Sequence, residues 1–329
     1  MIGQRCMIDS PSICGSFGGG QKKIKSRRLI SIDINVSNWH LVAMDSLSPS
    51  IAPAFAAATD VSDNASATPD FASLPLFNEA RPKPVLRPLK AWHHFRELLK
   101  DKENTEEVFH IFESLPWKGM RPAAEKFLQS ARGKTIRASE PYLPAILDDH
   151  AALRRLPAGS VAHAYCDFME REGLSAKGLV DEFERFNNGR YNFNDQFEWY
   201  LNRLRDTHDL LHILTGYGRD ALGEACVLAF TYSQQPSPAH LFIAYSAGLN
   251  MKKTVKTKAP VLHAVREGQK LGKACPRIVE TPIRELLAMQ VDEARAKLGI
   301  TPTRYYAQAH QTWQAGGIDP YDLLVVKAA

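Results

Sequence analysis

The stretch that decides the fold class is Asn194–Leu214, which reads NDQFEWYLNRLRDTHDLLHIL. Its apolar side chains recur every three or four residues, at Phe197, Tyr200, Leu201, Leu204, Leu211 and Leu214. Because an α-helix turns once in about 3.6 residues, this spacing places them on one side of a helix. The sequence therefore predicts one long amphipathic helix here, which Gly216 and Gly218 end.

The same spacing predicts helices on both sides of this stretch. They are expected at Leu89–Lys100, Thr105–Leu115, Ser160–Glu172, Ser175–Phe186, Arg219–Tyr232, Pro238–Leu249, Val255–Leu271, Pro282–Leu298 and Pro302–Ala315. Ser160 and Ser175 are expected N-caps, because their hydroxyl oxygens can accept hydrogen bonds from free N–H groups of the first turn. Convincing strand alternation is absent from the sequence. The predicted fold class is all-α, a single multi-helix domain with a disordered N-terminal arm.

The expected domain organisation follows from shifts in composition. Residues 1–43 are basic, and Ser31, Asp33 and Asn35 interrupt the apolar run that a secretory signal needs. A transit peptide remains one interpretation of them, and a true start at Met44 remains another. Residues 44–85 are rich in Ala, Ser, Pro and Asp, a composition that buries too little apolar surface to fold. We therefore expect a disordered leader and flexible arm over 1–85, a helical domain over 86–318, and a C-terminal tail over 319–329.

Composition and charge exclude several classes of protein. The 329 residues are 44% hydrophobic and 23% charged, as in an ordinary soluble chain. No run approaches the roughly 18 apolar residues of a spanning helix, so any membrane contact should be peripheral. The net charge of +5 is concentrated in residues 1–43, which hold six basic and two acidic side chains, so a nucleic-acid partner is not expected. The five cysteines show no CxxC spacing, which favours reduced thiols.

The candidate chemistry lies in His208, Asp209 and His212, followed by Glu224. Residues four apart on a helix share a face, so the two imidazoles can converge, with the Asp209 carboxylate about 100° around from His208. If the next helix folds back, Glu224 meets the same point. Two nitrogens and one or two oxygens suit Zn²⁺, Fe²⁺ or a similar divalent ion and leave a coordination position open.

A histidine pair at this spacing is more often a surface or packed pair than a metal site. Here, however, the polar groups lie in a segment otherwise lined by Leu210, Leu211, Ile213 and Leu214. Burying each of them without a partner costs roughly 1–3 kcal/mol, and one metal ion would satisfy all of them. The same leucines, with Val227, Leu228 and Phe230, could line an apolar groove, although core packing is the expected role of most of them.

The chain has the pattern His208-Asp209-x-x-His212, followed after eleven further residues by Glu224. This pattern resembles the HDxxHx11E signature of the fourth coenzyme-Q (ubiquinone) biosynthesis protein family, and the resemblance is to a bacterial-type member. The likeness extends upstream to Leu156–Ser160, Tyr165, Phe168-Met169 and Gly173–Ser175, and downstream to Arg295 and Leu298–Ile300. It covers about Leu156–Ile300. One departure is Ile283-Arg284, which stands where the family often has Trp-Glu.

The resemblance implies a metal-dependent lyase that decarboxylates a polyprenylated hydroxybenzoate precursor of ubiquinone, a reaction coupled in some accounts to hydroxylation. Zinc is the metal it favours, with iron or manganese as alternatives, held by His208, Asp209, His212 and Glu224 as catalytic residues and ligands. It implies a polyprenylated aromatic lipid substrate, other ubiquinone biosynthesis proteins as partners, and a homodimer more weakly. The expected location is peripheral, on the cytoplasmic face of the inner membrane, or the matrix side in a mitochondrion.

Two other functions stay open at this point. The first is a non-catalytic prenyl-lipid-binding scaffold that organises the ubiquinone biosynthesis enzymes and gives the metal a structural role. The second is an HD-type phosphohydrolase, whose further ligands would be His150 or His163 upstream and Asp292 downstream. A Ser-His-Asp hydrolase is disfavoured because the sequence has no nucleophile elbow.

Overall fold

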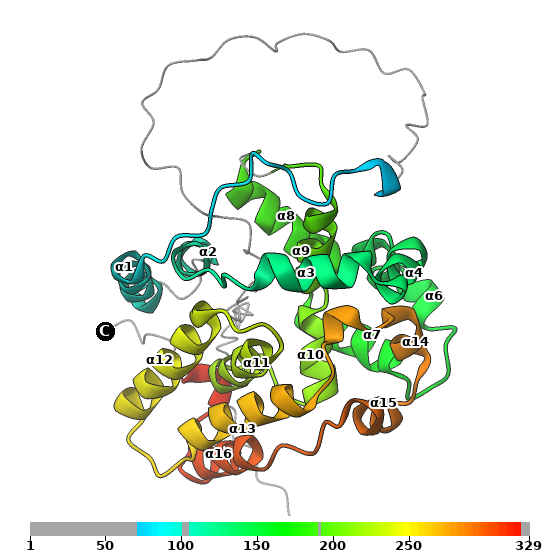
Figure 1. The fold of residues 1–329 in the computed structure, drawn as a ribbon. Helices are drawn as coiled ribbons and strands as arrows, with labels where there is room; N and C mark the ends of the chain where they lie inside the picture. The colour runs from blue at the N-terminus through cyan, green and yellow to red at the C-terminus, as the bar shows by residue number, and fades with distance from the viewer. Residues whose placement is uncertain (1–70, 101–104, 190–191, 324–329) are drawn as a thin grey trace, which may run out of the picture. The chain divides into compact units, whose positions relative to one another are not determined.

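The computed structural model describes residues 71–100, 105–189 and 192–323, and most of these residues are helical (Figure 1). The first half of the described chain forms α1 (Pro88–Lys100), α2 (Thr105–Ser114), α3 (Met120–Gln129), α4 (Ala131–Ser139), α5 (Leu143–Leu147), α6 (His150–Leu153), α7 (Val161–Glu172) and α8 (Ala176–Asn187). The second half forms α9 (Gln196–Asp206), α10 (His208–Thr215), α11 (Ala221–Gln234), α12 (Pro238–Thr254), α13 (Val261–Ala274), α14 (Ile283–Ala288), α15 (Val291–Leu298) and α16 (Arg304–Ala315). Short 3₁₀ turns lie at η1 (Phe71–Ser73), η2 (Ile278–Glu280) and η3 (Pro320–Asp322).

The all-α class is confirmed. Within the described ranges the residues form no strand, and β-pairing is limited to an isolated bridge between Ser160 and Gln290. The expected caps are also present: the Ser160 hydroxyl accepts from the His163 N–H at the start of α7, and that of Ser175 accepts from the Gly178 N–H at the start of α8. Residues 1–70, on which most of the expected N-terminal arm falls, lie outside the described residues.

The long helix predicted over Asn194–Leu214 is wrong in one respect, because it is broken into α9 and α10 at Thr207. The Thr207 hydroxyl donates to the carbonyl oxygens of Arg203 (3.0 Å) and Leu204 (3.2 Å). Such back-bonding competes with the N–H groups that would continue the helix and is a known cause of bends. His208 therefore becomes the first residue of a new helix, α10.

Other helices also differ from their predicted bounds. The expected helix Pro282–Leu298 is two helices, α14 and α15, separated where the Met289 carbonyl accepts the Val161 N–H (2.9 Å). That bond links the break to the start of α7. The helix α12 runs five residues beyond Leu249, and α13 begins only at Val261. The four helices α3 to α6 have no counterpart among the predicted ones.

The core is built around α11, which is buried along nearly its whole length and packs against α12 and α13. Two glycines of α13 permit this close approach: a Cβ at Gly268 would lie 2.5 Å from the Cys226 oxygen, and one at Gly272 2.1 Å from the Phe230 oxygen. The leucines expected to line a groove are core residues, as are Val227, Leu228 and Phe230, each at most 6% exposed. The core around α11 thus fixes the helix that carries Glu224.

Segments near both ends of the described chain pack against the helices, although their composition predicted a flexible arm and a tail. Within the expected flexible arm, Asn78 and Arg81 bind the Asp195 carboxylate at the N-terminus of α9, with Asn78 N–Asp195 Oδ2 at 2.8 Å and Arg81 Nη2–Asp195 Oδ1 at 2.6 Å. Within the expected tail, Leu323 is buried. The boundaries predicted at residues 85 and 319 therefore cut through segments that contact the helices, because charge pairing and single apolar anchors do not register in composition.

A buried histidine should make the stability of the fold depend on pH. His240 of α12 is fully buried against the Phe112 ring (4.9 Å between centroids), and burial lowers its pKa from 6.5 to about 3. An unfolded chain binds this proton below pH 6.5 while the folded chain does not, so stability is lost as the pH falls from about 6.5 toward 3. We expect this residue to cost about 2–3 kcal/mol at pH 4.5 relative to pH 7.

The measurement is urea unfolding at both pH values in the metal-free protein, with His240→Phe beside the wild type. The difference in unfolding free energy between pH 7 and pH 4.5 should be smaller in the variant, because the variant has no imidazole to protonate in the unfolded state. An equal difference in both proteins would show that His240 does not titrate as its burial requires.

Candidate metal centre

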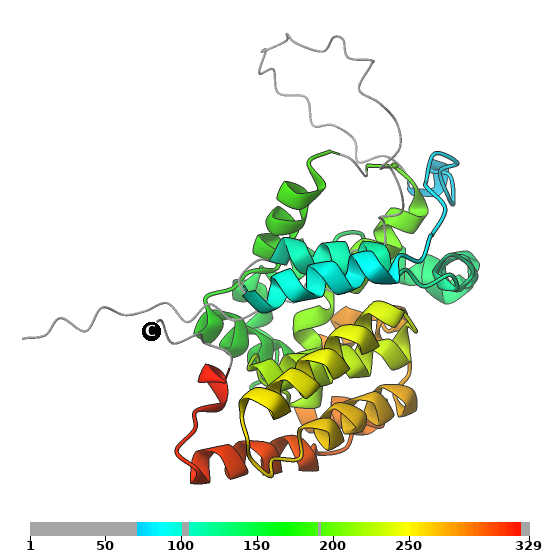
Figure 2. The same ribbon diagram turned by 90° about the vertical axis from the view of Figure 1, so that its left-hand side faces the viewer.

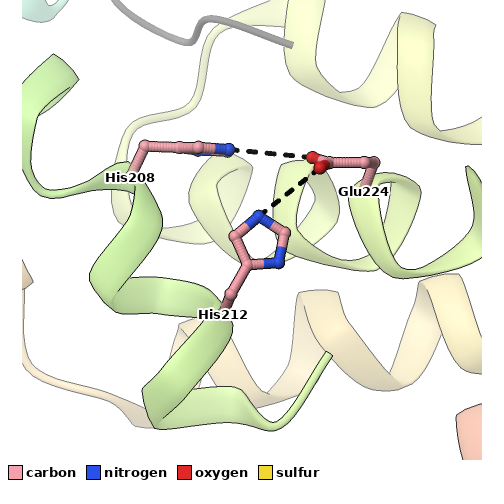
Figure 3. Close-up of side chains that lie close together, drawn as sticks. All are labelled: His208, His212 and Glu224. Atoms are coloured by element: carbon pink, nitrogen blue, oxygen red, sulfur yellow. Dashed lines mark ion pairs between the residues drawn. The ribbon is translucent and has the colours of Figure 1, made fainter. Parts of the chain in front are cut away.

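Three predicted ligands meet where α10 lies beside the N-terminal turns of α11. His208 and His212 project from successive turns of α10, and Glu224 projects toward them from α11 (Figure 3). The Glu224 carboxylate lies 3.7 Å from His208 Nε2 and 3.6 Å from His212 Nε2. One ligand atom from each residue lies within 4.8 Å of the others. The helix–break–helix arrangement that the sequence predicted for Glu224 is therefore the one that the structure has.

The three side chains are buried and incompletely paired. Their exposure is 6% for His208, 2% for His212 and 2% for Glu224. His208 Nδ1, His212 Nε2 and Glu224 Oε2 have no hydrogen-bond partner, because separations of 3.6 Å and more exceed hydrogen-bond distance. Burial lowers the pKa of both histidines and raises the pKa of Glu224. The site therefore holds neutral imidazoles beside a carboxylate that is costly to charge there.

This donor set fits a divalent cation. Two atoms that each lie about 2.0–2.2 Å from one ion are at most about 4.4 Å apart, so the nitrogen–oxygen separations of 3.6 and 3.7 Å are compatible with shared coordination. Neutral imidazole nitrogens and one carboxylate are the usual ligands of Zn²⁺ and of non-haem iron. A cation held by the two Nε2 atoms and the carboxylate would also supply the partners that His212 Nε2 and Glu224 Oε2 lack.

The orientation of His212 is set from the loop after α10. His212 Nδ1 lies 3.0 Å from the Tyr217 carbonyl oxygen, which can only accept, so Nδ1 carries the proton and Nε2 presents a lone pair toward Glu224. The Phe168 ring of α7 stacks on the imidazole at 5.5 Å between centroids. A backbone carbonyl behind a metal-binding histidine is the usual way to fix its tautomer.

Asp209 is the predicted ligand that does not lie with the others. It follows His208 by one residue, about 100° around the helix, so its carboxylate leaves a different side of α10. Burial raises its pKa to about 6, against the opposing effect of His208. Its role as ligand or catalytic residue stays a prediction, whereas His208, His212 and Glu224 form the group that could hold an ion.

The further ligands required by an HD-type phosphohydrolase are elsewhere. His150 pairs with Glu170 (3.2 Å), His163 Nε2 bonds the Arg154 carbonyl (3.1 Å), and Asp292 pairs with Arg295 (3.3 Å). None of the three candidates lies in the group formed by His208, His212 and Glu224. The structure therefore gives that interpretation no support.

Two cavities lie near the centre. The smaller, about 20 Å³, lies against His208 and is lined by Leu204, Thr207, His208, Leu211, Thr231, Gln234, Gln235, Ile278 and Val279. It holds about one water molecule. The larger, about 390 Å³, lies between η1, α5 and α9, and its wall includes Asp206, two residues before His208. His208, His212 and Glu224 do not line it, so a large substrate could reach the ligands only if side chains moved.

Sequence reasoning missed the residues that hold the loop between the two ligand-bearing helices. Arg219 and Asp220 are both buried. Arg219 Nε lies 3.9 Å from Glu224 Oε1. Asp220 caps α11 by accepting from the N–H groups of Leu222 (3.1 Å) and Gly223 (3.2 Å). The cap fixes the first turn of the helix in which Glu224 stands.

The C-terminal helix α16 supports this cap. The Tyr306 hydroxyl donates to Asp220 Oδ2 and accepts from the Gly218 N–H (2.9 Å), while His310 Nε2 lies 3.2 Å from Asp220 Oδ1. The Tyr306 ring also meets the Tyr217 ring edge-on at 5.2 Å. Burial and the adjacent Asp220 raise the pKa of Tyr306, so the phenol stays protonated and keeps donating. No motif in the sequence linked α16 to the metal ligands.

Removing the Tyr306 hydroxyl should lower the affinity of the site for a metal ion. We expect Tyr306→Phe to weaken Zn²⁺ binding about tenfold, because the hydroxyl joins Gly218 to the cap of the helix carrying Glu224. The matched control is Tyr305→Phe, since the Tyr305 ring contacts His263 instead. Competition with a chromogenic chelator measures both affinities. Equal affinities in the two variants would contradict the role assigned to Tyr306.

The fold and the site together define a class of protein. It is all-helical, and its buried His-His-Glu group lies on two helices joined by a loop. The family model described as "Coenzyme Q (ubiquinone) biosynthesis protein Coq4" matches residues 99–304. The chain therefore belongs to the Coq4 family of coenzyme Q (ubiquinone) biosynthesis proteins, as the HDxxHx11E pattern predicted.

Two curated relatives agree with the family assignment. The chain is 27% identical over 179 residues to "Ubiquinone biosynthesis protein coq4, mitochondrial" of Talaromyces stipitatus, covering 54% of this chain and 58% of that protein. It is 25% identical over 183 residues to the corresponding protein, coq-4, of Neurospora crassa, covering 54% and 49%. A crystal structure of a protein from Nostoc punctiforme is 20% identical, with a TM-score of 0.49, covering 66% of this chain and 100% of that one.

These matches limit what transfers to this protein. The chain spans only about half the length of the curated relatives that it matches. Both named curated relatives are fungal, so the bacterial-type expectation stays a prediction. In the described residues, no helix is long and apolar enough to cross a membrane.

Two residues of the motifs that resemble the family contact α10 in the structure. Arg295 of α15 donates to the carbonyl oxygens of Leu214 (3.0 Å) and Ile213 (2.9 Å), which are otherwise free at the C-terminal end of α10. Phe168 of the upstream motif stacks on His212. Motif residues far apart in the sequence therefore converge on α10, the helix that carries both histidines.

Proposed function

We propose that this protein is a metal-dependent carboxy-lyase of ubiquinone biosynthesis that acts on a polyprenylated hydroxybenzoate. The observation that carries the proposal is the buried His208, His212 and Glu224 group with its unpaired donor atoms. Membership of the Coq4 family supports the pathway. Zinc is the proposed metal, with iron or manganese as alternatives that the same donor set accepts.

The residues would act in distinct ways. The Nε2 atoms of His208 and His212 and the Glu224 carboxylate would hold the ion, whose positive charge would orient and stabilise an aromatic carboxylate. Tyr217 keeps His212 in the binding tautomer, and Arg219 lies 3.9 Å from Glu224 in surroundings that exclude water. Side chains around the 20 Å³ cavity must move to admit the ring.

The proposed decarboxylation has two possible forms, one simple and one oxidative, and the atoms and electrons balance in both. In simple decarboxylation the bond between the ring carbon and the carboxylate breaks, CO₂ leaves, and the ring carbon takes a proton. In the oxidative form, dioxygen and a two-electron reductant replace the carboxyl group by a hydroxyl group and release CO₂ and water. In the first form the electron pair of the broken bond passes to the ring carbon, where the proton takes it up. In both forms the bound ion would orient the carboxylate and so position the same ring carbon.

The associated partners and location are part of the same proposal. The relatives named above carry the word mitochondrial in their names. We propose a peripheral position on the matrix side of the mitochondrial inner membrane, or on the cytoplasmic face in a bacterium. There the polyprenylated aromatic lipid would be within reach. Other ubiquinone biosynthesis proteins and a second copy of the chain are the proposed protein partners.

The test measures substrate turnover and helical content in the same variants. Purified protein loaded with each metal is incubated with a prenylated 4-hydroxybenzoate, with and without dioxygen and a reductant, and release of CO₂ is measured. His208→Ala and Glu224→Ala should abolish the release while circular dichroism stays helical. Full turnover in both variants would refute the enzyme proposal.

The second candidate is a prenyl-lipid-binding scaffold, and the buried position of the metal group is what favours it, because a closed site suits a structural ion. It predicts that chelation unfolds the domain or releases partner proteins, while no reaction is measurable under any condition. The assay above therefore separates the two candidates.

A further inference from the structure

Exposed apolar side chains gather at the start of α1. The exposed fractions are 45% for Val85, 46% for Leu86, 85% for Leu89 and 52% for Trp92. The opposite side of the same helix carries Ala91, Phe95 and Leu98, which are buried. The helix α1 is therefore apolar on two sides, one packed on the core and one turned to solvent, which is unusual for a surface helix.

A second helix extends this face. The Phe242 ring of α12 lies 6.3 Å from the Trp92 ring and 5.3 Å from the Phe95 ring. Figure 2 shows α1 and α12 together on the side turned to the viewer, and Figure 1 shows both at one edge of the domain. Leu249, on the outer side of α12, is 56% exposed. We call the exposed and partly exposed side chains of residues 83–100 and of α12 with residues 255–258 the α1–α12 face.

The face is strongly basic. Around α1 it carries Lys83, Arg87, Lys90, Arg96 and Lys100, and the acidic residue among them, Glu97, pairs with Lys100 (2.6 Å). At the end of α12 it carries Lys252, Lys253, Lys256 and Lys258, with no acidic residue between Pro238 and Lys258. These nine basic side chains belong to a chain whose total net charge is only +5. Basic side chains therefore flank the exposed apolar side chains of the α1–α12 face.

The helix α2 packs against α1 and carries three glutamates that lie beside histidines. Glu107 pairs with His94 (2.6 Å), and Glu106 and Glu113 lie 3.7 and 3.4 Å from His110.

We propose that the α1–α12 face docks on the surface of an anionic lipid bilayer, with Leu86, Leu89 and Trp92 entering the interface and the basic side chains meeting lipid phosphates. Apolar residues and a tryptophan flanked by lysine and arginine are typical of interfacial helices. The five exposed apolar side chains, Leu249 included, are few for the core of a stable protein–protein interface, which buries about 800 Å² per partner. Most of the apolar part, Val85–Trp92, precedes the residues that the family model matches.

The inference does not depend on the proposed enzyme activity, and its test uses no substrate. The full chain, with its metal chelated, is sedimented with vesicles of phosphatidylcholine and phosphatidylglycerol in about a 7:3 ratio, and with phosphatidylcholine vesicles alone. We expect binding to the anionic vesicles that salt weakens. Leu86→Ser with Leu89→Ser, and separately Lys252→Gln with Lys253→Gln, should each weaken it at least about fivefold. The matched controls are Tyr142→Ser, an exposed aromatic outside the face, and Lys118→Gln with Lys134→Gln.

Depth of insertion gives a second readout that does not depend on affinity. Brominated lipids should quench part of the tryptophan emission, and Trp92→Phe should remove more of that quenching than Trp39→Phe or Trp117→Phe does, while Trp313 and Trp199 are buried. Wild-type vesicle binding by the Leu86/Leu89 variant together with unchanged quenching in Trp92→Phe would overturn the proposal. So would a concentration-dependent dimer that the Leu86/Leu89 variant abolishes while vesicle binding persists. Failure of the decarboxylase assay with intact vesicle binding would instead count against the proposed function alone.

Discussion

Glu224→Gln is expected to lower the affinity of the protein for Zn²⁺ by at least about 100-fold, more than loss of a supporting residue does. The carboxylate is the one negatively charged member of the buried group, and it lies 3.6 and 3.7 Å from the two histidine nitrogens. An amide of nearly the same shape keeps the packing but removes the charge that offsets the ion. His212→Ala should have an effect of similar size, because Nε2 is lost together with the support of Tyr217.

Affinity is measured by competition with a chelator of known strength, with thermal unfolding as a check on the fold. The matched control is Glu182→Gln on α8, a partly buried carboxylate whose pKa is also raised by burial. It should bind Zn²⁺ as the wild type does. Retained affinity in Glu224→Gln would show that the carboxylate is not a ligand.

Glu140→Leu is expected to destabilise the fold by about 3–5 kcal/mol, because it leaves a buried guanidinium without its counter-charge. Arg203 Nη1 lies 2.7 Å from Glu140 Oε2, and both side chains are 1% exposed. Burial already lowers the pKa of Arg203, against the opposing effect of Glu140. In a chain of this size the melting temperature should fall by about 10 °C.

The double variant Glu140→Leu with Arg203→Met separates loss of the pair from loss of one partner. It should regain most of the lost stability, although Arg203 also donates to the carbonyl oxygens of Val279 (2.8 Å) and Thr281 (2.7 Å). The surface comparison is Asp181→Ala, whose exposed pair with Lys177 should contribute under about 1 kcal/mol. A double variant no more stable than Glu140→Leu would contradict the assignment of the loss to an uncompensated charge.

Local signals in the sequence predicted most of the helices and the grouping of His208, His212 and Glu224. Serine caps at Ser160 and Ser175 act through hydrogen bonds within three residues, so they are visible without tertiary structure. The four-residue spacing of His208 and His212 fixes a shared face for the same reason. The return of Glu224 required only that two helices fold back around the glycine-containing loop.

Features set by contacts between distant segments were not predictable. The break at Thr207 depends on a hydroxyl that could equally have faced solvent. The gap between α14 and α15 depends on a backbone hydrogen bond to Val161, more than a hundred residues earlier. Arg203 looks like a surface residue in the sequence, because its buried partner Glu140 lies in a segment that showed no helical period. Tyr306 gained its role only from the fold, which brings α16 to Asp220.

The central claim, that α10 and α11 together hold one divalent ion, is tested most directly by anomalous diffraction from crystals grown with Zn²⁺ and measured on both sides of the zinc absorption edge. The account predicts one strong anomalous peak between the Nε2 atoms of His208 and His212 and the carboxylate of Glu224, and no peak there in crystals of Glu224→Gln. Zinc density only at other residues, with these three side chains arranged as they are now and no ion between them, would contradict it.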